Sequence, residues 1–119
     1  MHDIKTMETA RLNLVKIKAA AVKAELAYKI MERENETTAM TERMAEHQRS
    51  ITELLALNKN ISDVKEQKKM LLQKSRLEVA YAEMEFAIIE KGEDVERMQD
   101  HSRSQDAVIS ASDNALAAL

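Results

Sequence analysis

Histidine is the residue type in this chain best suited to metal binding or acid–base chemistry. His2, His47 and His101 stand far apart, so no two are spaced like the paired ligands of a zinc site. The chain contains no cysteine, which excludes thiolate ligands, a cysteine nucleophile and a disulfide framework. We therefore expect neither a bound metal nor another cofactor.

The segment QDHSRSQD holds an acid, a histidine and a serine in a row, which are the residue types of a catalytic triad. Asp100, His101 and Ser102 are consecutive, however, and consecutive helical residues point about 100° apart, so they do not converge. Carboxylates are plentiful, but acid–base catalysis requires them in a desolvated pocket, and the Glu-x-x-His motif of di-iron bundles is absent. The sequence predicts that the protein is not an enzyme.

Charge is segregated along the second half of the chain. Residues 59–76 carry a local balance of +4, and residues 83–106 carry a balance of −5. Two interpretations are open: solvated faces with ion pairs between helices, or a polar surface that guides a partner. The overall net charge of −3 makes nucleic acid an unexpected partner.

Composition predicts an all-α fold. The chain has no proline and a single glycine, Gly92, so it lacks the turn residues that sheets and hairpins need. Alanine, leucine, methionine, glutamate and lysine dominate, and all are good helix formers. The charged amino-terminal segment does not resemble a signal peptide, and no uncharged run is long enough to span a membrane. We expect a soluble, cytoplasmic protein.

Local signals divide the chain into three helices. Ser50 and Glu53 form a capping box, which favours a helix start at Ile51. Gly92 follows Lys91 as a helix-ending glycine would. We therefore expect one domain, residues 1–119, that folds as an elongated antiparallel three-helix bundle with helices at about 4–47, 51–91 and 94–117. The alternative is a long helical hairpin or coiled coil that breaks at LNKNISD, where Asn60 or Ser62 could cap.

Two helices of this three-helix plan carry apolar residues on two faces. The first has one band from Met7 to Met31 and another from Leu12 to Ile30. The second has a seam with three- and four-residue steps that runs from Leu54 through Leu71, Val79 and Phe86 to Ile89. A second stripe lies nearly opposite that seam and comprises Met70, Leu77, Tyr81, Met84 and Ile88. We expect the third helix to fold back and cover this second stripe.

Two short blocks resemble the tubulin-folding cofactor A family, also called tubulin-binding cofactor A. VKIKAAAVK supplies the Lys-Ile-Lys and Val-Lys elements of that family, and SRLEVAYAEME supplies its Arg-Leu-Glu-x-Ala-Tyr element. The chain departs from the family pattern in KKMLLQK, where Leu72 or Gln73 stands at the position of an expected proline. The resemblance implies a three-helix chaperone in the cytoplasm, associated with the cytoskeleton, that captures β-tubulin folding intermediates and passes them on toward the αβ dimer.

A client bound in this way would meet charged side chains. The candidates for contact, on this reading, are Lys16, Lys18, Lys23, Lys65, Lys69, Arg76 and Glu78. The protein would act as a monomer, although a dimer is the other possibility. The alternative function is a homo-oligomeric coiled-coil scaffold, adaptor or secretion chaperone that binds no tubulin. In that case the second stripe would face another subunit.

Overall fold

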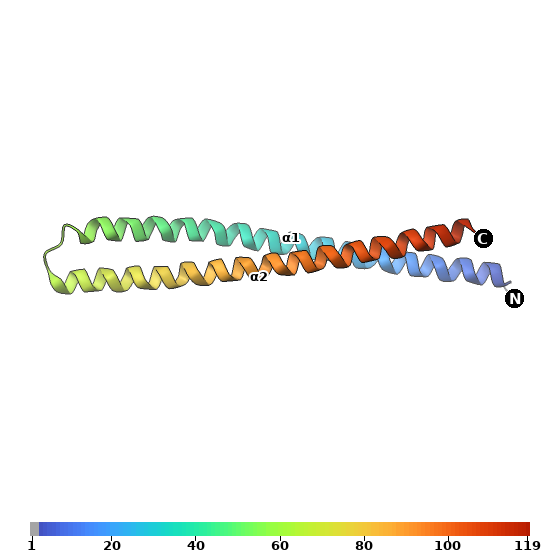
Figure 1. The fold of residues 1–119 in the computed structure, drawn as a ribbon, viewed down its shortest axis with the longest axis horizontal. Coiled ribbons are helices and arrows are strands. Elements are labelled where there is room, and N and C mark those ends of the chain that lie inside the picture. The colour runs from blue at the N-terminus through green and yellow to red at the C-terminus, as the bar shows by residue number, and fades with distance from the viewer. Residues whose placement is uncertain (1–2) are drawn as a thin grey trace. The chain divides into compact units, whose positions relative to one another are not determined.

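The computed structural model describes residues 3–119. Two helices account for nearly all of them: α1 spans Ile4–Asn58 and α2 spans Val64–Ala117 (Figure 1). The chain divides into two compact units. The terminal unit contains the described residues up to Arg33 together with Glu93–Leu119, and the hairpin unit contains Glu34–Gly92.

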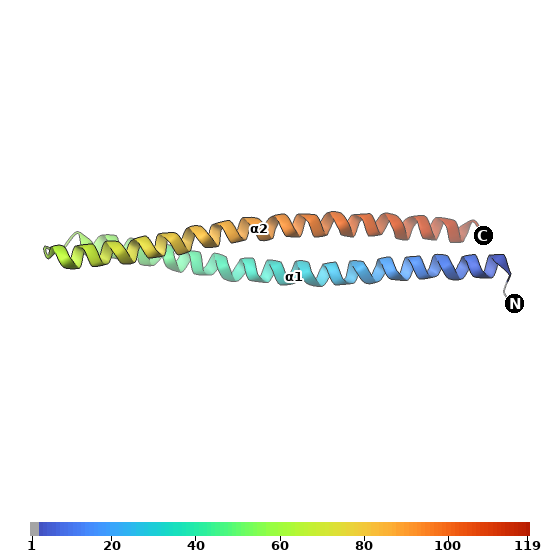
Figure 2. The same ribbon diagram turned by 90° about the horizontal axis from the view of Figure 1, so that it is seen from below.

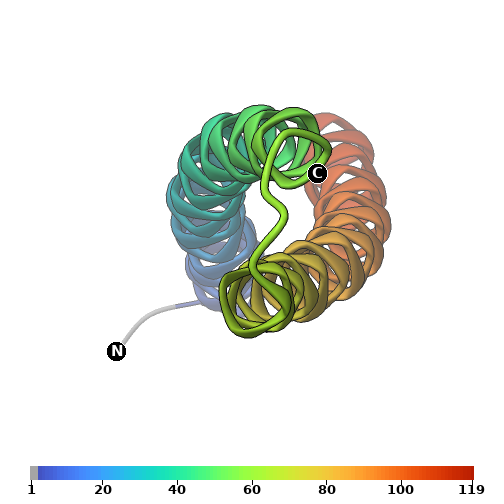
Figure 3. The same ribbon diagram turned by 90° about the vertical axis from the view of Figure 1, so that its left-hand side faces the viewer.

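In each unit a segment of α1 lies antiparallel to a segment of α2. In the terminal unit these are the first part of α1 and the last part of α2, drawn in blue and in orange to red (Figure 2). In the hairpin unit the last part of α1 leads through a short turn into the first part of α2, and Figure 3 looks onto this turn.

Aspartates begin both helices. The backbone N–H of Thr6 donates to Asp3 Oδ1 over 2.7 Å, and the backbone N–H of Lys65 donates to Asp63 Oδ1 over 3.1 Å. Both bonds satisfy amides that have no partner within the first turn of a helix. The turn after α1 is closed by the N–H of Asn60, which donates to the carbonyl of Leu57 over 3.1 Å.

The three-helix prediction is wrong, and the hairpin alternative is confirmed. Helix α1 continues through Ser50, which is half-buried among the residues that face α2, so its expected capping role does not arise. The break falls in the LNKNISD segment, but Asp63 caps α2 rather than Asn60 or Ser62. Helix α2 also continues through Gly92, which has no positive φ. A glycine inside a helix costs about 1 kcal/mol relative to alanine, an amount that packing on either side can offset.

The buried side of α2 is a regular coiled-coil seam. Its residues recur in steps of three and four and are all buried or half-buried: Gln67, Met70, Lys74, Leu77, Tyr81, Met84, Ile88, Lys91, Val95, Met98, Ser102, Gln105, Ile109, Ser112 and Leu116. The predicted second stripe therefore faces α1 within the hairpin unit and is not covered by a third helix. The α2 part of the predicted first seam, which includes Val79 and Phe86, is exposed instead.

The core of each unit is thin. Among the described residues, only Leu12, Ala19, Leu26 and Ile51 are buried apolar side chains, and Ser112 is the buried polar one. Several seam positions on α2 are polar or charged, which further limits the apolar area between the helices. Each unit is thus held by a single helix–helix seam that has no third layer.

Candidate partner-binding surfaces

The terminal unit exposes a continuous apolar stripe on α1. Its members recur in alternating steps of three and four residues and are all exposed: Met7, Ala10, Leu14, Ile17, Ala21, Ala24, Tyr28 and Met31. Ile17 is 65% exposed and Tyr28 is 59% exposed. This spacing is the one by which a helix meets another helix, but the α2 segment of the unit packs on the other band of α1. We call this surface the α1 stripe.

The hairpin unit exposes a matching stripe on α2. It comprises Leu72, Ser75, Val79, Ala82, Phe86 and Ile89, again in alternating steps of three and four, and Phe86 is 65% exposed. Leu71 and Val64 extend the apolar area beside it. We call this surface the α2 stripe. Contiguous exposed apolar surface on a protein typically marks an interaction site.

Two of the predicted contact residues hold the terminal unit together. Lys16 Nζ lies 2.6 Å from Asp113 Oδ1, and Lys23 forms an ion pair with Asp106. Both pairs join α1 to α2 across the edge of the seam. An equivalent pair in the hairpin unit joins Lys91 Nζ to Glu36 Oε2 over 2.5 Å. Ion pairs between the two helices therefore already involve Lys16 and Lys23.

The other predicted contact residues lie on exposed positions. In the hairpin unit, Glu78 Oε1 accepts from Lys74 Nζ over 2.8 Å within one turn of α2, and Lys65, Lys69 and Arg76 are exposed. Lys18 is exposed in the terminal unit, next to Ile17 of the α1 stripe. The seven predicted residues are thus divided between the two units and between seam edges and open surface, and no single site contains them all.

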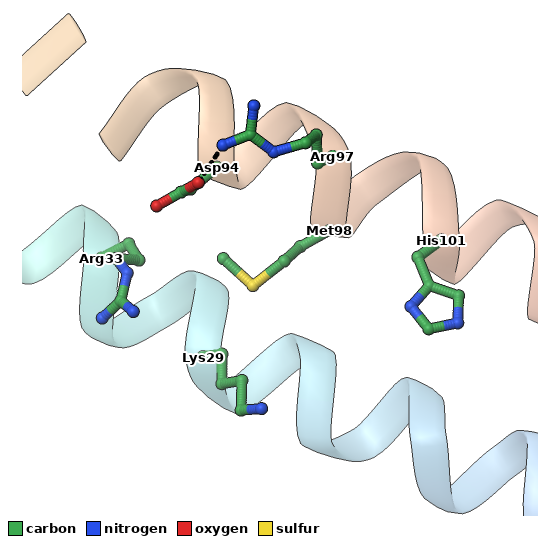
Figure 4. Close-up of a pocket in the computed structure, with 6 residues that line it drawn as sticks. All are labelled: Lys29, Arg33, Asp94, Arg97, Met98 and His101. Carbon is green, nitrogen blue, oxygen red and sulfur yellow. Dashed lines mark hydrogen bonds and ion pairs between the residues drawn. The ribbon is translucent and has the colours of Figure 1, made fainter. Parts of the chain in front are cut away.

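An open hollow in the terminal unit gathers basic side chains (Figure 4). It is lined by Lys29, Arg33, Asp94, Arg97, Met98 and His101. Asp94 forms an ion pair with Arg97 (Figure 4), so Asp94 compensates part of the positive charge of the hollow. Sequence reasoning did not connect the two groups of residues, because Lys29 and Arg33 of α1 approach the α2 residues only when the two helices pack together. The hollow is open to solvent, which screens its charges and makes it a weak anion site at most.

Asp100, His101 and Ser102 lie in three different environments and do not form a common site. Asp100 forms an ion pair with Arg103, His101 lines the basic hollow, and Ser102 is half-buried in the α2 seam. No group of three or more histidine, cysteine, aspartate or glutamate side chains that could hold a metal ion occurs within residues 3–119.

Resolved pKa shifts lie at the start of α1 and have local causes. The hydrogen bond from the backbone of Thr6 lowers the pKa of Asp3. The hydrogen bond from Arg11, whose Nε lies 3.0 Å from Glu8 Oε2, lowers the pKa of Glu8 and raises the pKa of Arg11. These shifts reflect helix capping and a surface ion pair, and none of the three groups lies in a pocket with a second catalytic candidate.

Neither described helix has a stretch that is both long and apolar enough for a membrane crossing. No protein-family model matches the chain, and no curated protein or solved structure matches it either.

Proposed function

We propose that this protein is a homo-oligomeric coiled-coil scaffold without catalytic activity. The observation that carries the proposal is the pair of uncovered apolar stripes, one in each unit. A helix with apolar residues on two opposite sides normally has two packing neighbours, and here the structure of a single chain supplies one. A further copy of the chain supplies the second.

The chemistry of the stripes also favours a structural role. They consist of aliphatic, aromatic and alanine side chains at helix-pairing spacing, and polar groups that could orient a small molecule are few on them. The charged candidates nearby are either paired within the chain or spread along open helix faces. Such a surface suits a helical partner.

Light scattering tests this proposal. A self-associating scaffold gives a mass that is a multiple of 13.5 kDa and that rises with concentration across the micromolar range. The variant Ile17→Gln with Phe86→Gln, which makes both stripes more polar, should shift the mass toward 13.5 kDa while the helix content stays the same. A wild-type chain that remains at 13.5 kDa at every concentration would contradict the scaffold function.

A tubulin-folding chaperone is the second candidate, and the two sequence blocks at Val15–Lys23 and Ser75–Glu85 favour it. The three-helix bundle that this resemblance implied is not the observed fold. The two sequence blocks are therefore the only support for the chaperone function. A chaperone of this kind would work in the cytoplasm beside the cytoskeleton. The discriminating experiment is a pull-down with β-tubulin at low and high salt: a salt-sensitive complex supports the chaperone, and its absence together with self-association supports the scaffold.

A further inference from the structure

The two stripes share an order of flanking charges. One edge of the α1 stripe carries Arg11, Lys18, Glu25 and Glu32 at intervals of seven residues, and all four are exposed. The same edge of the α2 stripe carries Lys69, Arg76, Glu83 and Glu90, which are exposed as well. Each edge therefore reads positive, positive, negative, negative along its helix.

The likeness extends to the stripes themselves. A shift of 58 residues aligns Leu14 with Leu72, Ala24 with Ala82 and Tyr28 with Phe86. The same shift places Lys16 on Lys74 and Ile30 on Ile88. The chain thus displays two versions of one docking surface, one in each unit.

On this basis we infer that the α1 stripe of one copy packs antiparallel against the α2 stripe of a second copy. This inference rests on the proposed scaffold function and specifies its interface. Reversing one helix turns the shared charge order into four complementary pairs, each between one copy and the other: Arg11 with Glu90, Lys18 with Glu83, Glu25 with Arg76, and Glu32 with Lys69.

A parallel arrangement lacks this match. In a parallel pair, the charged edge of one stripe faces the opposite edge of the other stripe. On α2 that opposite edge carries Glu78 and Glu85, which would stand against Glu25 and Glu32. Like charges placed in this way oppose association, so the charges select the antiparallel direction.

Side-chain sizes disfavour pairing of two α1 stripes, which leaves the α2 stripe as the partner of the α1 stripe. The register that forms the four charge pairs also places Tyr28 against Ser75, Ile17 against Phe86, and Ala24 against Val79. Two α1 stripes could satisfy the charges as well, but Ile17 would then meet Tyr28 on both sides of two alanine layers. Two adjacent alanine layers between crowded ones pack poorly, whereas the mixed pairing has a single alanine layer, Ala21 against Ala82, and so spreads its volume more evenly.

The flanking ion pairs determine the orientation of the two helices and contribute little to the affinity between the copies. Arg11 already pairs with Glu8, and Glu25 accepts from Lys29 over 3.1 Å on its own helix, so these two would share their charge with the partner. Exposed ion pairs contribute little individually. The apolar layers supply the affinity, and the charges choose orientation and register.

Disulfide mapping tests the pairing, because the wild-type chain has no cysteine. Full-length Ala21→Cys and Ala82→Cys proteins are mixed, oxidised and analysed by peptide mapping. The inferred register places these positions opposite each other, so the mixed disulfide between the two variants should dominate over either link between identical chains. Ala45→Cys, which is exposed outside both stripes, is the matched control and should not link to either. Links between identical chains only would overturn the inference.

Charge exchange supplies an independent test. Lys18→Glu alone and Glu83→Lys alone should each weaken self-association by about 5-fold, and the double variant should recover it. Pairing between two α1 stripes joins Lys18 to Glu25 instead, so the double variant would then not recover. Lys59→Glu, in the turn, is the charge-matched control. If the chain associates but neither the mixed link nor the recovery is found, the inference fails and the scaffold stands. If the chain stays monomeric, both fail.

Discussion

The terminal unit and the hairpin unit assign opposite roles to the two helices. In the terminal unit α1 is apolar on two sides, and the α2 segment that faces it contributes Ser102, Gln105 and Ser112 to the seam. In the hairpin unit α2 is apolar on two sides, and its α1 partner contributes polar seam residues such as His47 and Ser50. In each unit, the helix that is apolar on two sides is the one that keeps an exposed apolar stripe. The first apolar face holds each unit together, and on the proposed scaffold function the second serves association.

The largest difference between the two faces of a helix should appear when a charge is placed on each of them. Leu26→Asp in the terminal unit and Ile51→Asp in the hairpin unit bury a carboxylate in the seam, because each leucine or isoleucine is only 7% exposed. Each variant should lose about 3 kcal/mol or more of unfolding free energy, measured by urea denaturation followed by circular dichroism.

The matched control uses the same chemistry on the other face. Leu14→Asp alters a side chain that is 52% exposed, so the helix content of the variant should stay near that of the wild type while its self-association falls. Equal destabilisation by Leu14→Asp and Leu26→Asp in dilute solution, where self-association does not contribute to stability, would show that both faces are buried within one chain, contrary to the structure.

A smaller effect is expected at the end of the hairpin-unit seam. The side-chain oxygen of Asn58 is buried and has no hydrogen-bond partner. Leaving such a group unsatisfied is costly, so Asn58→Leu should stabilise the protein by about 1 kcal/mol in urea denaturation. Asn60→Leu, at an exposed turn position, is the control and should have little effect. Loss of stability in Asn58→Leu would mean that the amide makes a contact needed for the turn.

Gly92 gives a comparable test of the continuous α2. A Cβ added there would meet no atom within 4 Å, and its backbone is helical. Gly92→Ala should therefore stabilise the protein by about 0.5–1 kcal/mol and raise the melting temperature by a few degrees at fixed concentration. The reverse change at an exposed helical position, Ala20→Gly, should lower it. Destabilisation by Gly92→Ala would instead support a helix end at Gly92, as the sequence predicted.

The smallest predicted effect concerns the start of α1. The pKa of Asp3 is lowered in the folded protein, so its capping contribution is complete above the unfolded pKa and is lost as pH falls through the folded one. Below about pH 4 we expect faster amide hydrogen exchange at Thr6 than the general pH trend gives. Asp3→Asn, which keeps a capping oxygen, should abolish that extra pH dependence. An unchanged profile would remove the capping interpretation.

Much of the fold could be predicted from the sequence, but the pairing of faces could not. The absence of proline predicted helices, and LNKNISD was identified as one of two candidate breaks. The helix ends predicted at Ser50 and Gly92 were wrong because capping signals are local. The three- and four-residue periodicity that continues through both positions outweighed them. Both bands on α1 have helix-pairing spacing, so only the opposite helix decides which one is buried. The 58-residue likeness between the stripes is visible in the sequence and would have indicated two arms in place of three helices.

The site was predicted less completely than the fold. The positive charges of Lys16 and Lys23 were assigned to a partner, yet they pair with Asp113 and Asp106, whose proximity depends on how α1 and α2 pack. The stripes were recognised as apolar bands but were expected to be covered within the chain. Their exposure is what the structure adds.

Hydroxyl-radical footprinting at low and high protein concentration shows whether a further copy of the chain covers the two stripes. Stripe residues Tyr28, Met31 and Phe86 should be labelled in dilute solution and protected as concentration rises. Seam residues Met44 and Met84, which are half-buried against the neighbouring helix, should be labelled weakly at both. Stripe labelling that stays strong at every concentration would show that no further copy covers these surfaces, and the scaffold account would be wrong.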